Sequence, residues 1–152
     1  MSIRRAAVLL ALAFSLVAAQ VACTADRERP IPTSTPVSEL EPGEYRSTSL
    51  TSTTGDEFTD PADSLSLTIS RDGNYRLSID DGCNVQSGPF HIDDGIITVT
   101  KLSATFVACE PPRGDSGTFA SDLLSAPVSA TRAGADLSWA NSTDEIVFVR
   151  AD

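Results

Sequence analysis

Apolar and polar residues alternate with a period of two through most of the chain after Gly43. The pattern is clearest in Leu65 to Ser70 and in Tyr75 to Asp80, where every second residue is apolar. This period is typical of β-strands with one buried face. The same reasoning extends along the chain and predicts about eight strands, at residues 43–50, 64–70, 75–80, 85–92, 96–105, 128–132, 136–140 and 145–149.

Tight turns separate these strands. An Asp-Gly pair occurs at residues 72–73, 81–82 and 94–95, where Asp favours the start of a turn and Gly tolerates a positive φ. Short strands joined in this way indicate a mainly β fold, a small antiparallel meander that closes into a barrel or a strongly rolled sheet. The residues expected to fill its interior are Leu67, Ile69, Tyr75, Leu77, Val99, Trp139 and Phe148.

One segment, Asp115 to Leu124, has the spacing of a helix, because Phe119 lies on the same face as Leu123 and Leu124. Ser116 or Asp115 is expected to cap its N-terminus. We place this single short helix before the sixth strand, where it plugs or flanks the barrel.

The N-terminus has the features of an export signal. Arg4 and Arg5 precede an uncharged stretch from Ala6 to Ala22, of which residues 6–19 are strongly apolar. That stretch is shorter than the roughly 20 residues of a membrane-spanning helix, so we predict that residues 1–22 are a signal peptide that is removed.

The end of this stretch, Val21-Ala22-Cys23, resembles a bacterial lipobox, although Gln20 stands where an apolar residue is usual. The sequence therefore predicts that Cys23 is lipid-modified and anchors the exported protein to the bacterial cell membrane. Two alternatives remain: an ordinary secretory cleavage that leaves Cys23 as a free thiol, and twin-arginine export that uses the N-terminal Arg pair.

A tether and one domain follow the cleavage site. Residues 23–42 comprise Cys23 and a segment rich in Pro, Ser and Thr that has too few large apolar residues to fold alone. Residues 43–152 have the size of one β domain. The sequence thus predicts a domain held off the membrane by an extended stalk.

The charge of the chain excludes one class of partner. The mature chain keeps all 21 carboxylates but only nine of the 11 basic residues, which gives a net charge of −12. Such a surface repels phosphate backbones and has no basic stripe, so nucleic-acid binding is not expected.

Cys83 and Cys109 are the only internal pair that can form a disulfide, and pairing is the default in an oxidising compartment. The alternatives are two free buried cysteines, or redox or metal chemistry. A metal site is disfavoured because the only histidine, His91, would have to join both sulfurs and no CxxC spacing occurs.

Asn84 follows Cys83 directly and has two interpretations. Its amide either braces the backbone of a tight bend or contacts a ligand at the mouth of the barrel. No catalytic residues are assigned, because a Gly-x-Ser-x-Gly motif is absent and His91 is expected to face solvent on its strand. We expect neither enzyme activity nor a cofactor.

The order of several segments resembles the META domain, also called the HslJ family. The similarity covers about residues 43–150 and rests on Gly73-Asn74-Tyr75-Arg76-Leu77, Gly82-Cys83-Asn84, Ser87-Gly88-Pro89-Phe90, Thr105-Phe106-Val107-Ala108-Cys109 and Leu137-Ser138-Trp139. Two positions depart from the family pattern: Val107 stands where Met is frequent, and Tyr45 where Trp is more usual.

This resemblance implies a small antiparallel β-barrel-like domain found in bacterial envelope lipoproteins. The family is linked broadly with heat induction, novobiocin resistance and secretion-related virulence, and it brings no agreed catalytic residues. We therefore expect a non-enzymatic envelope lipoprotein that acts in stress tolerance or envelope integrity through a protein partner. The alternative is a binding module that holds a small molecule in the barrel interior.

Overall fold

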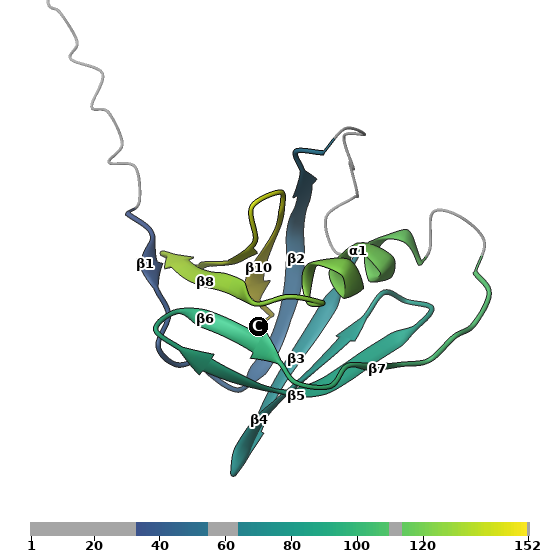
Figure 1. Cartoon of the computed structure of the whole chain (residues 1–152), viewed down its shortest axis with the longest axis horizontal. Coiled ribbons are helices and arrows are strands. Elements are labelled where there is room, and N and C mark those ends of the chain that lie inside the picture. The colour runs from purple at the N-terminus through teal and green to yellow at the C-terminus, as the bar shows by residue number, and fades with distance from the viewer. Residues whose placement is uncertain (1–32, 55–63, 110–113, 152) are drawn as a thin grey trace, which may run out of the picture. The chain divides into compact units, whose positions relative to one another are not determined.

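A computed structural model describes residues 33–54, 64–109 and 114–151, and Cys23 lies outside these ranges. The described ranges form ten strands and one helix (Figure 1). These elements are β1 (Thr35–Pro36), β2 (Gly43–Ser52), β3 (Ser66–Asp72), β4 (Asn74–Asp80), β5 (Val85–Asp93), β6 (Ile96–Val99), β7 (Ser103–Ala104), α1 (Asp115–Leu123), β8 (Val128–Ala133), β9 (Asp136–Ala140) and β10 (Asp144–Arg150).

Eight of the strands form a closed antiparallel barrel. Their order is β8-β6-β5-β4-β3-β2-β10-β9, and β9 pairs back with β8 to close the circle. Closure leaves the main strands without an open edge, which is how small all-β domains satisfy their backbone groups. The predicted mainly β barrel is thus confirmed, with two short extra strands, β1 and β7.

The predicted alternation determines which side chains enter the barrel. In β3 and β4, Leu67 lies opposite Ile79 and Ile69 lies opposite Leu77, and all four are buried. The intervening Ser and Thr residues point outward. Gly73 makes the turn between these strands with φ of +79°, a conformation that Gly adopts at low cost.

A bulge in β2 changes the alternation of its side chains. Ser47 pairs with Phe148 and Ser49 with Val147, so Thr48 is an extra residue in the ladder. Tyr45 and Leu50 consequently both face the interior, although they are five positions apart and regular alternation would place them on opposite faces.

The strand predicted over residues 96–105 is interrupted. Val99 pairs with Phe90, and Ser103 pairs with Ser87, so three residues on one strand face two on β5. The bulged backbone approaches β5 so closely that a Cβ on Gly88 would overlap the carbonyl oxygen of Lys101. Gly88 therefore permits the bulge that divides β6 from β7.

The folded domain also begins earlier in the chain than the composition of the predicted tether indicates. Thr35 and Pro36 pair with β8, and the N–H of Val37 donates to the carbonyl of Ala130 at 3.0 Å. Val37 and Leu40 are buried in the core. Val37 follows Pro36 and Leu40 lies between two Glu residues, so neither belongs to an alternating apolar pattern that would predict its burial.

Side chains fill the barrel interior. Of the seven residues expected there, Leu67, Ile69, Leu77, Trp139 and Phe148 are fully buried, and Tyr75 and Val99 are partly buried against the core. The rings of Trp139 and Phe148 meet edge to face, with centroids 5.3 Å apart, an arrangement that aromatic pairs favour.

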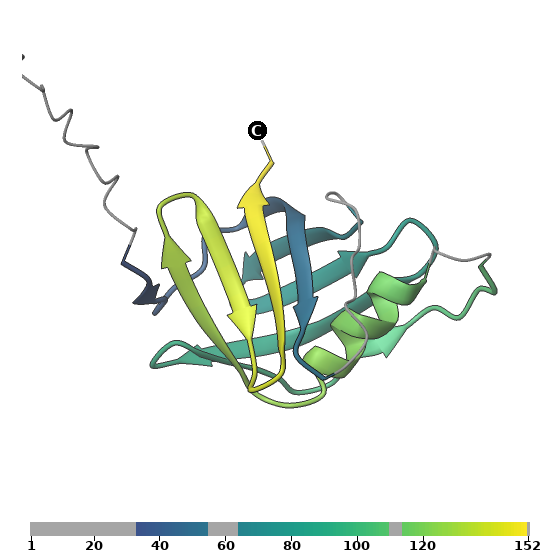
Figure 2. The same cartoon turned by 90° about the horizontal axis from the view of Figure 1, so that it is seen from above.

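Helix α1 contacts β4, β5 and β10 (Figure 2). It buries Leu123 and Ala120, and Phe119 packs partly against the core. The helix precedes β8 rather than the sixth strand of the chain, because β1 and β7 come before it. The expected caps were wrong: Gly114 is the N-cap residue with φ of +93°, and no side chain caps the helix.

Within the described ranges, no helix has the length and apolar character needed to cross a membrane.

Candidate functional site: the cystine corner

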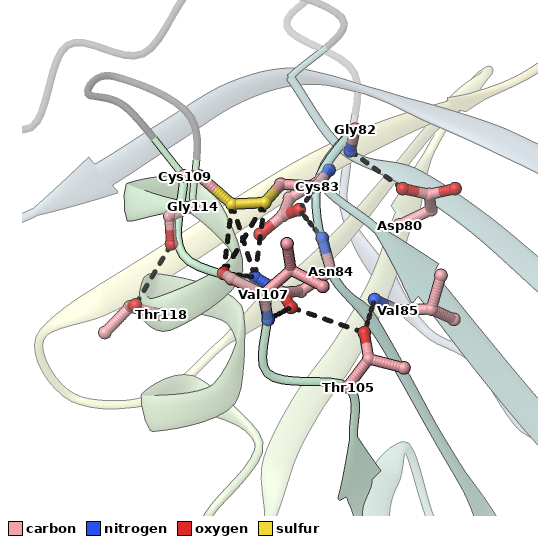
Figure 3. The surroundings of a disulfide bond; sticks show 11 residues. Asp80, Gly82, Cys83, Asn84, Val85, Thr105, Val107, Cys109, Gly114 and Thr118 are labelled. Atoms are coloured by element: carbon pink, nitrogen blue, oxygen red, sulfur yellow. Dashed lines mark hydrogen bonds between the residues drawn. A yellow bond between two sulfur atoms is a disulfide. The ribbon is translucent and has the colours of Figure 1, made fainter.

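Cys83 and Cys109 form a disulfide that joins two loops at one side of the barrel (Figure 3). Their Cα atoms are 6.4 Å apart, and 26 residues separate them in sequence. Cys83 lies in the turn between β4 and β5, and Cys109 follows β7. The predicted pairing is confirmed. We call residues 81–85 and 105–109 together the cystine corner.

Two carboxylates organise the turn that carries Cys83. The Asp81 carboxylate accepts hydrogen bonds from the N–H groups of Cys83, at 2.8 Å, and of Asn84. The N–H of Gly82 donates to the Asp80 carboxylate at 2.7 Å. Asp side chains that bind backbone N–H groups two or three residues ahead stabilise tight turns. The disulfide therefore starts from a turn whose backbone donors are satisfied.

The Asn84 side chain connects this turn to the second loop. The N–H of Val107 donates to the Asn84 amide oxygen at 2.7 Å, and the amide nitrogen donates to the Val107 carbonyl at 3.2 Å. The same nitrogen lies 3.5 Å and 3.6 Å from the two disulfide sulfurs. Both polar atoms of the amide are engaged within the protein, which supports the bracing interpretation over the ligand contact.

Thr105 continues the connection toward β5. Its hydroxyl donates to the Asn84 amide oxygen at 3.3 Å and accepts from the N–H of Val85 at 2.9 Å, while its own N–H donates to the Val85 carbonyl at 3.0 Å. The loop before Cys109 thus lies along β5 as a strand-like extension of β7.

Buried polar groups join the corner to helix α1. Asp81 is only 8% exposed, and a Cβ on Gly117 would overlap its second carboxylate oxygen. The side-chain amide of buried Gln86 donates to the Gly117 carbonyl. A carboxylate beside the first turn of a helix interacts favourably with the positive end of the helix dipole. Asp81 therefore packs between its own turn and the first turn of the helix.

Sequence reasoning missed this contact between the turn and the helix. Asp81 has the composition of an ordinary turn residue, and its burial depends on a helix more than 30 positions away. The burial of Gln86 could have been predicted from the alternation in β5, because Gln86 points to the same inward face as Gly88 and Phe90. A polar side chain on an inward position predicts a buried hydrogen bond.

The remaining residues singled out by the sequence lie apart from the corner. His91 is exposed on β5, as predicted. In the ranges that the structure covers, no group of three or more His, Cys, Asp or Glu side chains is placed to hold a metal ion. Cys23 lies outside those ranges, so its lipidation stays a prediction. The arrangement as a whole is a rigid brace with an exposed loop surface, and the polar atoms of its Asn84 amide are already used within it.

Comparison with known proteins identifies the family. The META domain family matches residues 38–152. The fold resembles an NMR structure of a protein from Burkholderia xenovorans, with a TM-score of 0.61 and 20% identity, covering 74% of this chain and 83% of that one. A second NMR structure has a TM-score of 0.57 and 19% identity, covering 74% and 92% of the two chains. Among curated proteins, none matches. At these identities the structures support the fold alone, whereas the match over residues 38–152 means that the chain belongs to the META domain family.

Proposed function

We propose that this protein is a non-enzymatic, lipid-anchored protein of the bacterial envelope that supports stress tolerance or envelope integrity by binding a protein partner. Membership of the META domain family supports an envelope-related role. The predicted export signal and the lipobox-like sequence at Cys23 support a membrane anchor, and the net charge of −12 expected for the mature chain would hold the domain away from an anionic membrane surface.

The observation that carries the partner proposal is the filled barrel. The largest fully buried side chains are those of Trp139, Tyr45 and Phe148, and they occupy the interior together with leucine and isoleucine residues. A barrel of eight strands is wide enough either for its own side chains or for one small ligand. Because side chains take the space here, the outer surface is the part that recognises another molecule.

The anchor is tested by fractionating cells that carry the wild-type chain or the Cys23→Ser variant. We expect the wild type in the membrane fraction and the variant in the soluble fraction. The Gln20→Leu variant is the matched control, because it restores an apolar residue to the lipobox and should remain in the membrane fraction. An unchanged distribution of Cys23→Ser would exclude lipidation at this residue.

The physiological role is tested by deleting the gene and measuring growth at raised temperature and with novobiocin. We expect a growth defect that the wild-type gene restores and that Cys23→Ser restores only partly. Equal growth of the deletion and parent strains under both conditions would refute the stress role.

A second candidate, small-molecule binding, has one observation in its favour. Among the described residues, the buried side-chain atoms Trp139 Nε1 and Gln86 Oε1 have no hydrogen-bond partner, and buried polar groups are normally satisfied. Native mass spectrometry of protein purified from its own envelope tests this candidate. A retained small molecule would favour it over the partner proposal, and a mass equal to that of the lipidated chain would argue against it.

A further inference from the structure

Exposed apolar side chains gather at the cystine corner. In the described part of the chain, the exposed large hydrophobic residues are Phe106, Val107, Val85 and Ile96. Phe106 is 95% exposed and Val107 is 60% exposed, and Val85 lies on β5 directly beside this loop, hydrogen-bonded to Thr105. Three of these four residues thus belong to one pair of neighbouring segments. Clustered exposed apolar side chains mark interaction sites more often than isolated ones do.

The same loop presents an open backbone edge. Among the described strands, β7 pairs with β5 alone. The N–H groups of Thr105 and Val107 both point toward the β5 side, to the Val85 carbonyl and the Asn84 amide. Because successive N–H groups of an extended strand point to opposite edges, those of Ala104 and Phe106 point away from β5. We call residues 103–107, seen from this side, the open edge.

The open edge lacks the usual protection against strand pairing. Natural proteins guard exposed edges with charged residues, proline or a covering element. Residues 102–109, Leu-Ser-Ala-Thr-Phe-Val-Ala-Cys, contain neither charge nor proline, and residues 103–108 are all exposed. At the same time the disulfide and the Asn84 amide hold this loop in place. A preorganised loop loses less conformational entropy when a partner binds.

The charge of the chain indicates which partner fits. Two copies of a chain with net charge −12 repel each other, so a second copy is disfavoured. Strand β1, near which the described residues begin, lies on the opposite side of the barrel from β7 (Figure 1). An extended segment of another protein, apolar or uncharged in its centre and basic at its ends, complements both the edge and the charge.

We propose that the open edge is a docking site at which an extended segment of an envelope protein, with basic ends, adds as a further antiparallel or parallel strand and covers Phe106. The proposal rests on the proposed function, because it specifies the surface that the protein partner uses. Backbone hydrogen bonds to Ala104 and Phe106 supply affinity in this type of recognition, and the aromatic side chain acts as an anchor.

Peptide binding to the full-length protein in detergent tests the site. The probe is a library of eight-residue peptides with Lys at both ends and Val, Ile, Thr, Ser, Phe or Tyr at the six inner positions. We expect selected peptides to bind the wild type and to lose at least tenfold in affinity for Phe106→Ala. The matched control is Ile96→Ala, which removes the exposed apolar side chain that lies outside the corner and should leave affinity unchanged.

Two further measurements distinguish strand pairing from nonspecific hydrophobic binding. Selected peptides with alternate N-methylated residues keep their side chains but cannot donate along one edge, and we expect them not to bind. Amide hydrogen exchange at Ala104 and Phe106 should slow at least tenfold in the complex, while Thr105, already bonded to Val85, should change little. The proposal is overturned if no peptide binds, if N-methylation has no effect, or if protection appears elsewhere. Preferential binding of a peptide of residues 102–108 would also overturn it, in favour of a second copy.

Crosslinking in cells separates this proposal from the proposed function. A photoreactive phenylalanine analogue is placed at position 106 or, as a control outside the cystine corner, at position 136, the exposed first residue of β9. A crosslink from position 106 to an extended segment of an envelope protein that is uncharged in its centre and basic at its ends would support the docking site. Crosslinks from position 136 alone would overturn it and leave the partner proposal standing. Absence of crosslinks from both positions, and from a scan of the remaining exposed residues, would overturn both.

Discussion

Asn84 and Val107 exchange two hydrogen bonds, one in each direction: the Val107 N–H donates to the Asn84 amide oxygen, and the Asn84 amide nitrogen donates to the Val107 carbonyl. A side-chain amide has the same donor and acceptor groups as a peptide unit. Asn84 therefore takes the place of a backbone unit in the ladder and extends the pairing of β5 with the segment after β7. The disulfide lies directly beside this pair.

The first prediction concerns this pair. Asn84→Ala removes both hydrogen bonds, and we expect a loss of about 1 to 2 kcal/mol in the free energy of unfolding, since each net hydrogen bond contributes about 1 kcal/mol. The Val107 amide should exchange its hydrogen faster than in the wild type. Urea unfolding and hydrogen exchange measure the two effects. Ser103→Ala, at an exposed position of β7, is the control; equal stability of the two variants would contradict the role of Asn84.

The second prediction concerns the disulfide. Linking residues 26 apart restricts the unfolded chain and contributes about 3 to 4 kcal/mol on the loop-entropy estimate. The double variant Cys83→Ala/Cys109→Ala should lose that amount in urea unfolding. Wild-type protein under reducing conditions should lose a similar amount, while Cys23→Ser should be as stable as the wild type. If reduction leaves the unfolding midpoint unchanged, the disulfide does not stabilise the domain.

Much of the fold could be predicted because the information is local. Alternation in β3 and β4 places Leu67, Ile69, Leu77 and Ile79 on one face whatever the rest of the chain does, and Gly73 at positive φ makes the turn between the strands. The barrel follows from many such short strands with tight connections.

The features that escaped prediction depend on distant neighbours. The bulge that ends β6 requires a glycine at position 88 of the neighbouring strand, because the Lys101 carbonyl lies where a Cβ would be. The alternation of residues 96–105 does not indicate this bulge. The segment that carries buried Val37 is held by hydrogen bonds to β8, nearly 100 positions along the chain. At the corner, pairing of Cys83 with Cys109 could be predicted by counting cysteines, whereas the contact between Asp81 and Gly117 could not.

That contact gives the third prediction. Gly117→Ala adds a methyl group where the Asp81 carboxylate lies, so helix α1 or the turn must move, although Ala has the higher helix propensity. We expect a loss of about 1 to 3 kcal/mol, typical of overpacking. Combining it with Asp81→Gly should cost less than the sum of the two single variants, because the overlap disappears. Urea unfolding of the wild type, the two single variants and the double variant measures this coupling. Asp122→Ala, at an exposed position of α1, is the control. Additive losses would show that the two residues are not coupled.

The last prediction concerns the effect of acid on stability at Asp144, the first residue of β10. The Ser52 hydroxyl donates to the Asp144 carboxylate at 2.6 Å and holds the pKa of Asp144 below its usual value, and the Thr143 hydroxyl adds a bond of 2.9 Å. Because the folded pKa is lowered, the ionised carboxylate stabilises the fold above the unfolded pKa of about 3.9, and this contribution is lost as the pH falls through the lower folded pKa.

Melting temperatures measured between pH 2 and pH 7 test whether the ionised Asp144 carboxylate stabilises the fold. Wild type should melt above Asp144→Asn at pH 5 to 7, and the difference should shrink below about pH 4, as the unfolded chain and then the folded one take up the proton. In a Ser52→Ala background, the difference in melting temperature caused by Asp144→Asn should be smaller, because the hydrogen bond from Ser52 that favours the ionised carboxylate is gone. Asp136→Asn, at the exposed first residue of β9, is the control for general loss of charge. A difference between wild type and Asp144→Asn that stays constant down to pH 2 would contradict the assignment, since a contribution from ionisation cannot survive protonation of the group that carries it.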